Sequence, residues 1–217
     1  NVLIPMLPRH GRRSMRLREL RGLRAEEFRD YADAAVDIAA GLGQEIVAIG
    51  ISGGASVVGW MAQNRAEMDT GLLLAPFVGV PRVHPFVGTV MANAYSRVPS
   101  FNIEDPLEPR RDWVYRGQTT RALAETLRLG RAIFRQARHA APLARRIIIL
   151  TTARETQVSN AAAARLAALW RARGANVEEP QFAAELAIPH NAIDPAADPA
   201  KKAIVYARML ELLGETS

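Results

Sequence analysis

Short apolar runs alternate with longer amphipathic stretches along this chain. The middle runs are aliphatic or β-branched without period-two alternation, which is typical of strands buried on both faces of a parallel sheet. The predicted strands are residues 2–5, 45–51, 71–76, 146–151 and 176–183, and the predicted helices are residues 25–42, 54–65, 119–139, 159–173 and 199–213. This alternation predicts an α/β fold with a mostly parallel sheet and helices on both faces.

One segment interrupts the alternation. Residues 77–142 contain a stretch with Pro, Gly and aromatic residues followed by a long helical pattern, and no strand is predicted there. The sequence shows no repeat, no low-complexity tract and no linker that would separate a second full domain. We therefore expect one core built from residues 1–76 and 143–217, with residues 77–142 inserted after its third strand.

A candidate nucleophile lies at the end of the second predicted strand. That strand runs into Gly50-Ile51-Ser52-Gly53-Gly54, a G-x-S-x-G sequence in the strand–turn–helix context that a nucleophilic serine requires. The tight turn lifts the hydroxyl of Ser52 above the strand ends, and flanking glycines avoid clashes. Gly53 N–H, at the start of a helix, is a candidate oxyanion donor. The alternative is a phosphate-binding or simply close-packed turn, but no G-x-x-x-x-G-K-[ST] and no strand-linked G-x-G-x-x-G occurs.

A serine nucleophile needs a base and a carboxylate that orients this base. His190 follows the last predicted strand, at a carboxyl strand end where parallel sheets place ligands. Glu155 follows the preceding predicted strand, so the chain order is nucleophile Ser52, acid Glu155, base His190. Glu155 has an alternative role as an ion-pair partner of Arg154 or as a helix cap, and Asp194 is a rival acid. Structural or surface roles are expected for His10, His84 and His139.

The composition is that of an ordinary globular protein. The 217 residues include 49% hydrophobic side chains and no cysteine, which excludes intrinsic disorder and small disulfide-stapled folds. The net charge of +6 comes mostly from arginines spread over the whole chain. One dense run comprises Arg9, Arg12, Arg13, Arg16, Arg18, Arg21 and Arg24. No aromatic residues interleave with this run as a single-strand binder needs, so we expect solvated ion pairs with Glu19, Glu26 and Glu27 and no nucleic-acid partner.

Other classes of site are not indicated. No run of eighteen apolar residues occurs, so no membrane span is predicted. The four histidines are scattered and no HExxH motif is present, so we expect neither a metal nor a cofactor. We expect a cytoplasmic protein rather than a secreted one; a signal peptide would have to precede Asn1.

Taken together, these features resemble the α/β-hydrolase superfamily, and within it the carboxylesterase and monoglyceride-lipase-like group. The resemblance covers nearly the whole chain. It is carried by Gly50-Ile51-Ser52-Gly53-Gly54, Leu72-Leu73-Leu74-Ala75-Pro76, Glu155-Thr156-Gln157-Val158 and Pro189-His190. The resemblance implies ester hydrolysis by a Ser52, Glu155, His190 triad. It also implies that residues 77–142 are the family's variable cap, or lid, which forms the acyl or alcohol pocket.

The chain departs from the family pattern at two places. Family members more often carry Asp than Glu at the acid position. Residues 2–5 match the strand just before the nucleophile strand, and Arg9 replaces the first glycine of a Gly-His-Gly-like turn, which makes His10 structural. The family's first strands, and the loop with the second oxyanion donor, then have no counterpart in this sequence. We expect the native chain to be longer at its N-terminus.

The hypothesis with the most support is cleavage of a small ester with an apolar acyl or aryl group. Apolar residues of the cap either line a pocket for that group or pack the cap onto the sheet; they are Phe77, Val78, Val80, Phe86, Val87, Val90, Met91, Tyr95, Val98 and Phe101. A thioesterase, amidase or acyltransferase would use the same triad. A non-catalytic hydrolase-fold binding protein is the alternative from a different class.

Overall fold

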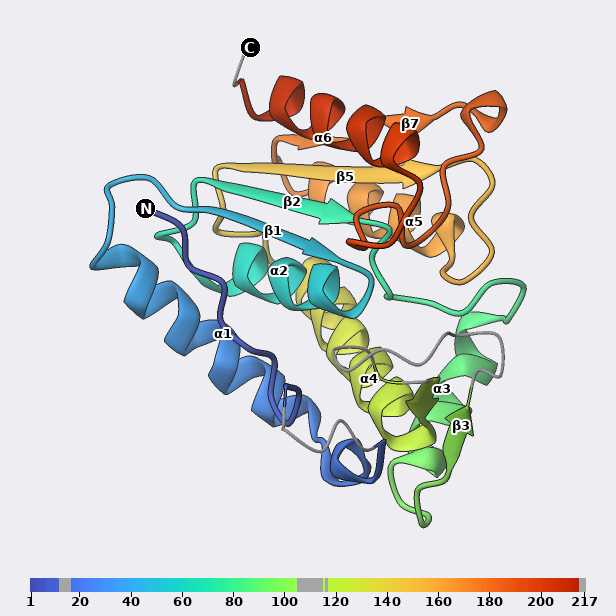
Figure 1. Ribbon diagram of the computed structural model, residues 1–217. Helices are drawn as coiled ribbons and strands as arrows, with labels where there is room; N and C mark the ends of the chain where they lie inside the picture. Colours follow the sequence, from blue (N-terminus) through green and yellow to red (C-terminus); the bar gives the residue numbers. More distant parts are fainter. Residues whose placement is uncertain (12–16, 105–114, 116, 215–217) are drawn as a thin grey trace.

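The computed structural model describes residues 1–11, 17–104, 115 and 117–214 (Figure 1). Its centre is a parallel sheet in the order β1, β2, β5, β6, with β7 pairing the end of β5. The strands are β1 (Val47–Ile51), β2 (Thr70–Leu74), β5 (Arg146–Thr152), β6 (Val177–Glu178) and β7 (Gln181–Phe182). Ile51, Leu74 and Leu150 lie side by side in the register, so β1, β2 and β5 end at one edge of the sheet.

Helices cover both faces of the sheet, as predicted. One face carries α1 (Ala25–Ala40), α2 (Gly53–Asn64), α4 (Thr120–Ala137) and α5 (Asn160–Arg171), and the other carries α6 (Pro199–Leu213). Alternate residues of β5 serve the two layers: Ile147 and Ile149 pack with the first group of helices, and Ile148 packs with α6. A strand that contributes to two apolar cores has to be apolar throughout, which is why these runs lacked alternation in the sequence.

Helix signals in the sequence coincide with the observed ends. Asp198 caps α6 by accepting a hydrogen bond from Ala200 N at 2.9 Å, and Gly214 ends that helix with φ of 82°. Ser159 caps α5 by accepting a hydrogen bond from Ala162 N at 3.2 Å. These contacts satisfy backbone groups that have no partner within the helix itself.

The N-terminal segment is not the strand that its apolar residues predicted. Residues 1–7 have no regular structure and run along α1, where Tyr31 Oη donates to Pro5 O at 2.9 Å. Val2 and Ile4 are 86% and 89% exposed. Extended backbone becomes a strand only by pairing with a neighbour, and no described strand pairs with this segment. Downstream, Arg9 forms an ion pair with Glu27 at 2.9 Å, as expected, and the expected pairs of Arg12, Arg13 and Arg16 lie outside the described residues.

Two further differences concern short elements. The predicted strand at residues 176–183 is two strands, β6 and β7, separated at Glu179 and Pro180, because proline has no N–H for a sheet ladder. The inserted segment contains a helix, α3 (Pro85–Tyr95), and an antiparallel pair, β3 (Asn102–Glu104) and β4 (Gly117–Thr119), that were not predicted. The remaining helical turns are η1 (Leu17–Gly22) and η2 (Ala184–Leu186).

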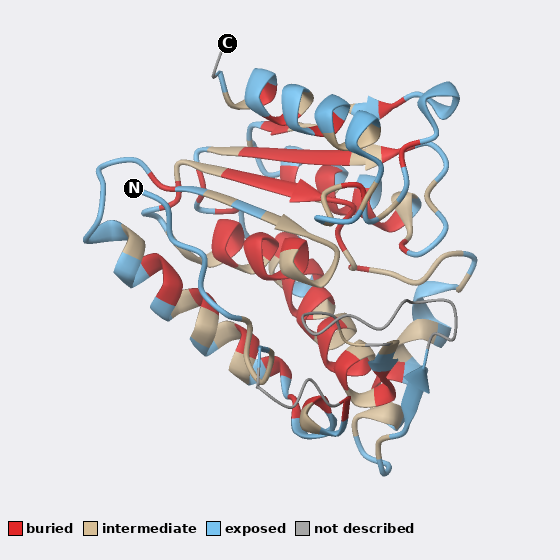
Figure 2. Ribbon diagram, in the orientation of Figure 1, coloured by how far each residue is buried: buried red, intermediate tan, exposed pale blue. Residues whose placement is uncertain are grey.

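The assignment of residues 77–142 to a cap stays a prediction. Within this segment α3 is largely exposed, whereas much of α4 is buried (Figure 2). Leu129 and Ile133 of α4 are fully buried in the same cluster as α2 and β2. The second half of the segment therefore belongs to the helical layer that supports the sheet.

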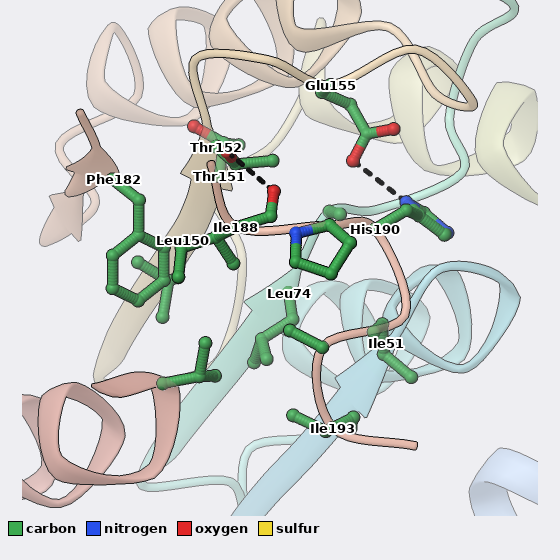
Figure 3. A pocket seen from close by; sticks show the side chains of 14 residues that line it. Ile51, Leu74, Leu150, Thr151, Thr152, Glu155, Phe182, Ile188, His190 and Ile193 are labelled. Carbon is green, nitrogen blue, oxygen red and sulfur yellow. Dashed lines mark hydrogen bonds and ion pairs between the residues drawn. The ribbon is translucent and has the colours of Figure 1, made fainter. Parts of the chain in front are cut away.

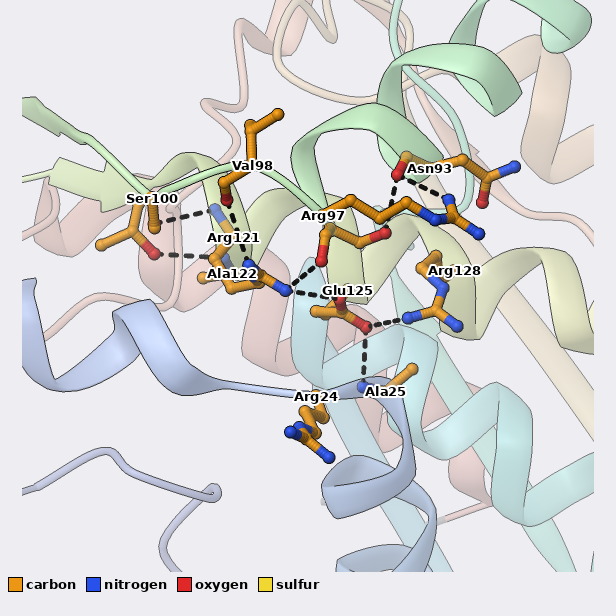
Figure 4. Close-up of polar contacts among 12 residues, drawn as sticks. Arg24, Ala25, Asn93, Arg97, Val98, Ser100, Arg121, Ala122, Glu125 and Arg128 are labelled. Carbon is orange, nitrogen blue, oxygen red and sulfur yellow. Dashed lines mark hydrogen bonds and ion pairs between the residues drawn. The ribbon is translucent and has the colours of Figure 1, made fainter.

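A buried carboxylate joins α4 to the start of α1 (Figure 4). Glu125 is 1% exposed and accepts hydrogen bonds from Ala25 N at 3.0 Å and from Arg128 Nη1 at 2.8 Å. Arg121 Nη1 lies 3.8 Å from the other carboxylate oxygen. A buried carboxylate is tolerated only when charged and N–H partners replace its water. This contact helps to hold α4 where Thr126 borders Gly53.

No helix within the described part of the chain is long and apolar enough to cross a membrane.

Candidate active site

Ser52 lies on a strained turn between β1 and α2. Its φ is 54° and its ψ is −117°, a conformation that a residue with a side chain adopts only when its surroundings impose it. Ser52 N donates to Leu74 O at 2.9 Å, and Ser52 O accepts from Phe77 N at 3.1 Å. These bonds to the end of β2 and to the segment after it hold the turn open, so that the serine side chain is presented at the strand ends.

The two glycines that flank the turn have different roles. A Cβ on Gly50 would lie 2.5 Å from Gly54 O and 2.8 Å from Ala55 N, so the chain can double back here only without a side chain. A Cβ on Gly54 would meet nothing within 4 Å. The predicted steric need for glycine therefore holds at Gly50, where a side chain would clash with the backbone of Gly54. It does not hold at Gly54, where a side chain would find open space.

Glu155 and His190 lie against each other although they come from separate loops (Figure 3). Glu155 follows β5, and His190 lies in the turn after η2. His190 Nδ1 and Glu155 Oε2 are 2.8 Å apart, and the two side chains are 10% and 0% exposed, respectively. With the carboxylate ionised, Nδ1 carries the proton and donates it, which leaves Nε2 as the acceptor nitrogen.

The second oxygen of Glu155 is held by the backbone. Oε1 accepts hydrogen bonds from Thr156 N at 2.9 Å, Gln157 N at 2.7 Å and Val158 N at 3.3 Å. Burial alone would raise the pKa of Glu155, but the hydrogen bond from His190 and the backbone N–H groups outweigh it, so the pKa lies below its ordinary value. The carboxylate is thus ionised and fixed in one orientation.

This pKa predicts how stability depends on pH. Because the pKa of Glu155 in the folded protein lies below the ordinary 4.5, the unfolded chain takes up the proton first as the pH falls. The stabilisation is complete above about pH 4.5 and is lost as the pH falls through the lower folded-state pKa. We expect the free energy of unfolding of the wild type to exceed that of Glu155→Gln at about pH 5, and the gap to shrink towards about pH 3, in urea titrations. A gap that widens on acidification would contradict the ionised pair.

Ser52 and the Glu155–His190 pair share the same edge of the sheet. Ile51, the residue before Ser52, lines a small cavity together with His190, Glu155 and Leu74. Ser52 Oγ and His190 are not hydrogen-bonded in this structure; such contacts are often long in unliganded enzymes and shorten when substrate binds. The cavity measures about 30 Å³, room for about two water molecules.

The rival residues have other contacts. Asp194 Oδ1 accepts a hydrogen bond from Ala196 N at 2.7 Å. His10 Nδ1 lies 2.8 Å from Pro8 O, and His84 caps α3 by accepting from Phe86 N at 3.3 Å. His139 lies two residues after Ala137, the last residue of α4.

Two side chains that no motif indicated lie beside the acid–base pair. Thr152 Oγ1 donates to Ile188 O at 3.2 Å, and Asn160 Nδ2 donates to Thr152 O at 2.8 Å. In the sequence, Thr152 follows a predicted strand, and Asn160 is one of two candidate caps, with Ser159, of the helix after it, so neither residue is linked to the site by its position in the chain. Only the pairing of the two loops in space shows that both residues hold the site.

Within residues 1–11, 17–104, 115 and 117–214, no group of three or more His, Asp or Glu side chains is placed to hold a metal ion.

Comparison with solved structures finds similar folds at low sequence identity. A monoacylglycerol lipase from Paleococcus ferrophilus is 14% identical over 89% of this chain and 77% of that chain, with a TM-score of 0.61. A soluble variant of monoglyceride lipase from Saccharomyces cerevisiae, in complex with a substrate analogue, is 12% identical over 88% of this chain and 69% of that chain, with a TM-score of 0.62. A structure from the metagenome-derived lipolytic enzymes LipS and LipT is 14% identical over 98% of this chain and 81% of that chain, with a TM-score of 0.64.

No protein-family model and no curated protein matches this sequence.

Proposed function

With the α/β-hydrolase fold as its framework, we propose that this protein is a serine hydrolase that cleaves a carboxylic ester through an acyl-enzyme on Ser52. The fold was predicted from the sequence and is confirmed by the likeness to solved lipolytic enzymes. The observation that carries the proposed activity is the Glu155–His190 contact of 2.8 Å at the sheet edge where Ser52 occupies a strained turn. A carboxylate, an imidazole and a strained serine gathered at one edge of the sheet are the parts that acyl transfer requires.

Ser52, His190 and Glu155 have distinct roles in the proposed reaction. His190 Nε2 takes the proton from Ser52 Oγ as that oxygen attacks the ester carbonyl, and the alkoxide leaves with the same proton. Water, deprotonated by His190, then releases the acid and restores Ser52. Glu155 remains ionised throughout, keeps the proton on Nδ1 and stabilises the imidazolium that forms.

Gly53 N–H is the proposed oxyanion donor. Gly53 is the first residue of α2, so its N–H has no acceptor within the helix. The positive end of the helix dipole adds to the field at this point. The side of α4 that carries Thr126 borders Gly53, with Thr126 Cγ2 at 3.6 Å from the position of a Cβ there.

The proposed substrate is a small ester with an apolar acyl or aryl group. The described cavity beside His190 has a mostly apolar lining, and the inserted segment exposes further apolar side chains on α3. Phe86 is 68% exposed and Val90 is 51% exposed. A surface of this kind supplies apolar contact for an ester that approaches Ser52 from the side of the inserted segment.

A fluorophosphonate probe tests the proposed function directly. We expect stoichiometric labelling of Ser52, located by peptide mass spectrometry, and hydrolysis of p-nitrophenyl esters. A panel of acyl chain lengths, with matched thioesters and amides, then separates an esterase from a thioesterase or amidase. Folded protein that is neither labelled nor active on any member of the panel would identify a non-catalytic binding protein.

A further inference from the structure

We propose that Thr152 is a positioning residue for the acid–base pair, because its hydroxyl binds the loop of His190 while its carbonyl binds the loop of Glu155. The expected effect on turnover rests on the proposed function. The tether, by which we mean the hydrogen bonds that link Thr152 to the two loops, is given by the structure and does not depend on that function. Thr152 is the last residue of β5, and it is 4% exposed.

The hydroxyl of Thr152 holds the loop that carries the base. Oγ1 donates to Ile188 O at 3.2 Å, a contact between residues 36 apart in the chain. Ile188 is 4% exposed and lies two residues before His190. Figure 3 shows this bond beside the bond between Glu155 and His190, so both hydrogen bonds link the end of β5 and its loop to the loop of the base.

The carbonyl of Thr152 holds the loop that carries the acid. Thr152 O accepts hydrogen bonds from Asn160 Nδ2 at 2.8 Å and from Glu155 N at 3.3 Å. Asn160 is the first residue of α5, so the acid loop is closed on itself between the end of β5 and the start of α5. Hydrogen bonds to Thr152 therefore position both the loop that carries Glu155 and the loop that carries His190.

Packing alone does not call for a hydroxyl at this position. Alternate residues of a strand face the same side of a sheet, and the two residues that precede Thr152 on this side, Ile148 and Leu150, are buried and apolar. Valine would fill the same volume as threonine. A buried hydroxyl is costly without a hydrogen-bond partner, so its presence here is explained by the bond to Ile188 O.

The effect on the acid–base pair is one of distance and angle. Glu155 and His190 are 35 residues apart, so local chain geometry does not set their separation. Loss of the tether frees the His190 loop to move relative to Glu155. A displacement of about 1 Å at a catalytic group can reduce turnover by about 100-fold.

The test compares Thr152→Val with two matched variants. Thr151→Val removes a neighbouring hydroxyl that accepts a hydrogen bond from Gln181 Nε2 at the surface, and Thr152→Ser keeps the tethering hydroxyl. On a p-nitrophenyl ester we expect Thr152→Val to lower kcat by about 10- to 100-fold with KM changed by less than about 3-fold. Thr151→Val and Thr152→Ser should stay near the wild type.

A proton NMR signature separates positioning from general destabilisation. The His190 Nδ1 proton, hydrogen-bonded to Glu155, should give a low-field signal in the wild type, in Thr151→Val and in Thr152→Ser, and a shifted or absent signal in Thr152→Val. The same signal is read without substrate, so it tests the tether even if the wild type proves inactive, an outcome that would overturn the proposed function alone.

A second variant covers a failure to fold. If Thr152→Val does not give a cooperative unfolding transition, Asn160→Ala, which removes the donor to Thr152 O and leaves Thr152 intact, takes its place with the same expected changes. Wild-type kcat together with an unchanged Nδ1 signal in whichever variant folds would overturn the proposal. An equal loss in Thr151→Val would overturn it as well.

Discussion

Replacing Ser52 with Ala is expected to lower kcat by about 10⁴-fold or more. The variant loses the only atom that the proposed mechanism uses to form a covalent acyl-enzyme, while the oxyanion donor and the substrate contacts remain. The measurement is the steady-state rate on the best p-nitrophenyl ester of the panel, together with fluorophosphonate labelling, which should disappear. Because alanine is smaller and also adopts a positive φ only with strain, unfolding transitions of both proteins should be compared.

Ser96→Ala is the matched control for this change. Ser96 Oγ donates to Asn93 O at 2.9 Å at the end of α3, away from the sheet edge that carries Ser52. We expect its turnover and labelling to match those of the wild type. Near-wild-type turnover in Ser52→Ala would show that another residue is the nucleophile.

Glu155→Gln should lower kcat by about 10³- to 10⁴-fold with the fold retained. The amide keeps the size of the side chain, but it cannot stabilise the imidazolium, and its N–H₂ group can hold His190 in the tautomer that has no acceptor facing Ser52. The backbone N–H groups of Gln157 and Val158 would also lose a charged acceptor. The rate should be measured beside the midpoint of thermal unfolding, so that lost activity is not mistaken for lost structure.

Asp194→Asn distinguishes between the two candidate acids. Asp194 is only four residues beyond His190 in the chain, and its Oδ1 accepts a hydrogen bond from Ala196 N. If Glu155 is the acid, Asp194→Asn should retain turnover within about 3-fold of the wild type, because the amide keeps the size of the side chain and its oxygen can still accept the hydrogen bond from Ala196 N. A large loss in Asp194→Asn with little change in Glu155→Gln would reverse the assignment.

The fold could be predicted where the sequence pattern is continuous and local. The strands β1, β2 and β5 lie within one or two residues of their predicted bounds. For β2 and β5, burial on both faces requires apolar residues at nearly every position, whereas β1 is an edge strand in which Val47 and Ile49 are 47% and 46% exposed. The cap Asp198 and the terminal Gly214 marked the bounds of α6, because capping is a local interaction between a few neighbouring residues.

Prediction failed where a short element depends on its neighbour. The strands β3 and β4 have three residues each and are mostly exposed, so no apolar run marks them. Conversely, residues 2–5 are apolar enough to predict a strand, yet no described strand pairs with them. Strand formation needs a hydrogen-bonding partner, and composition carries no information about whether one is present.

The sequence by itself determined the parallel α/β core and the turn on which Ser52 lies, because both depend on local patterns: continuous apolar runs, and glycine where a Cβ on Gly50 would meet the backbone of Gly54 at 2.5 Å. It also placed Glu155 and His190 at strand ends. Only the tertiary structure decided that these two side chains bind each other at 2.8 Å, and that Thr152 connects their loops. Those contacts join segments about 35 residues apart, and such a distance is closed by the packing of the sheet and its helices rather than by any local property of the chain.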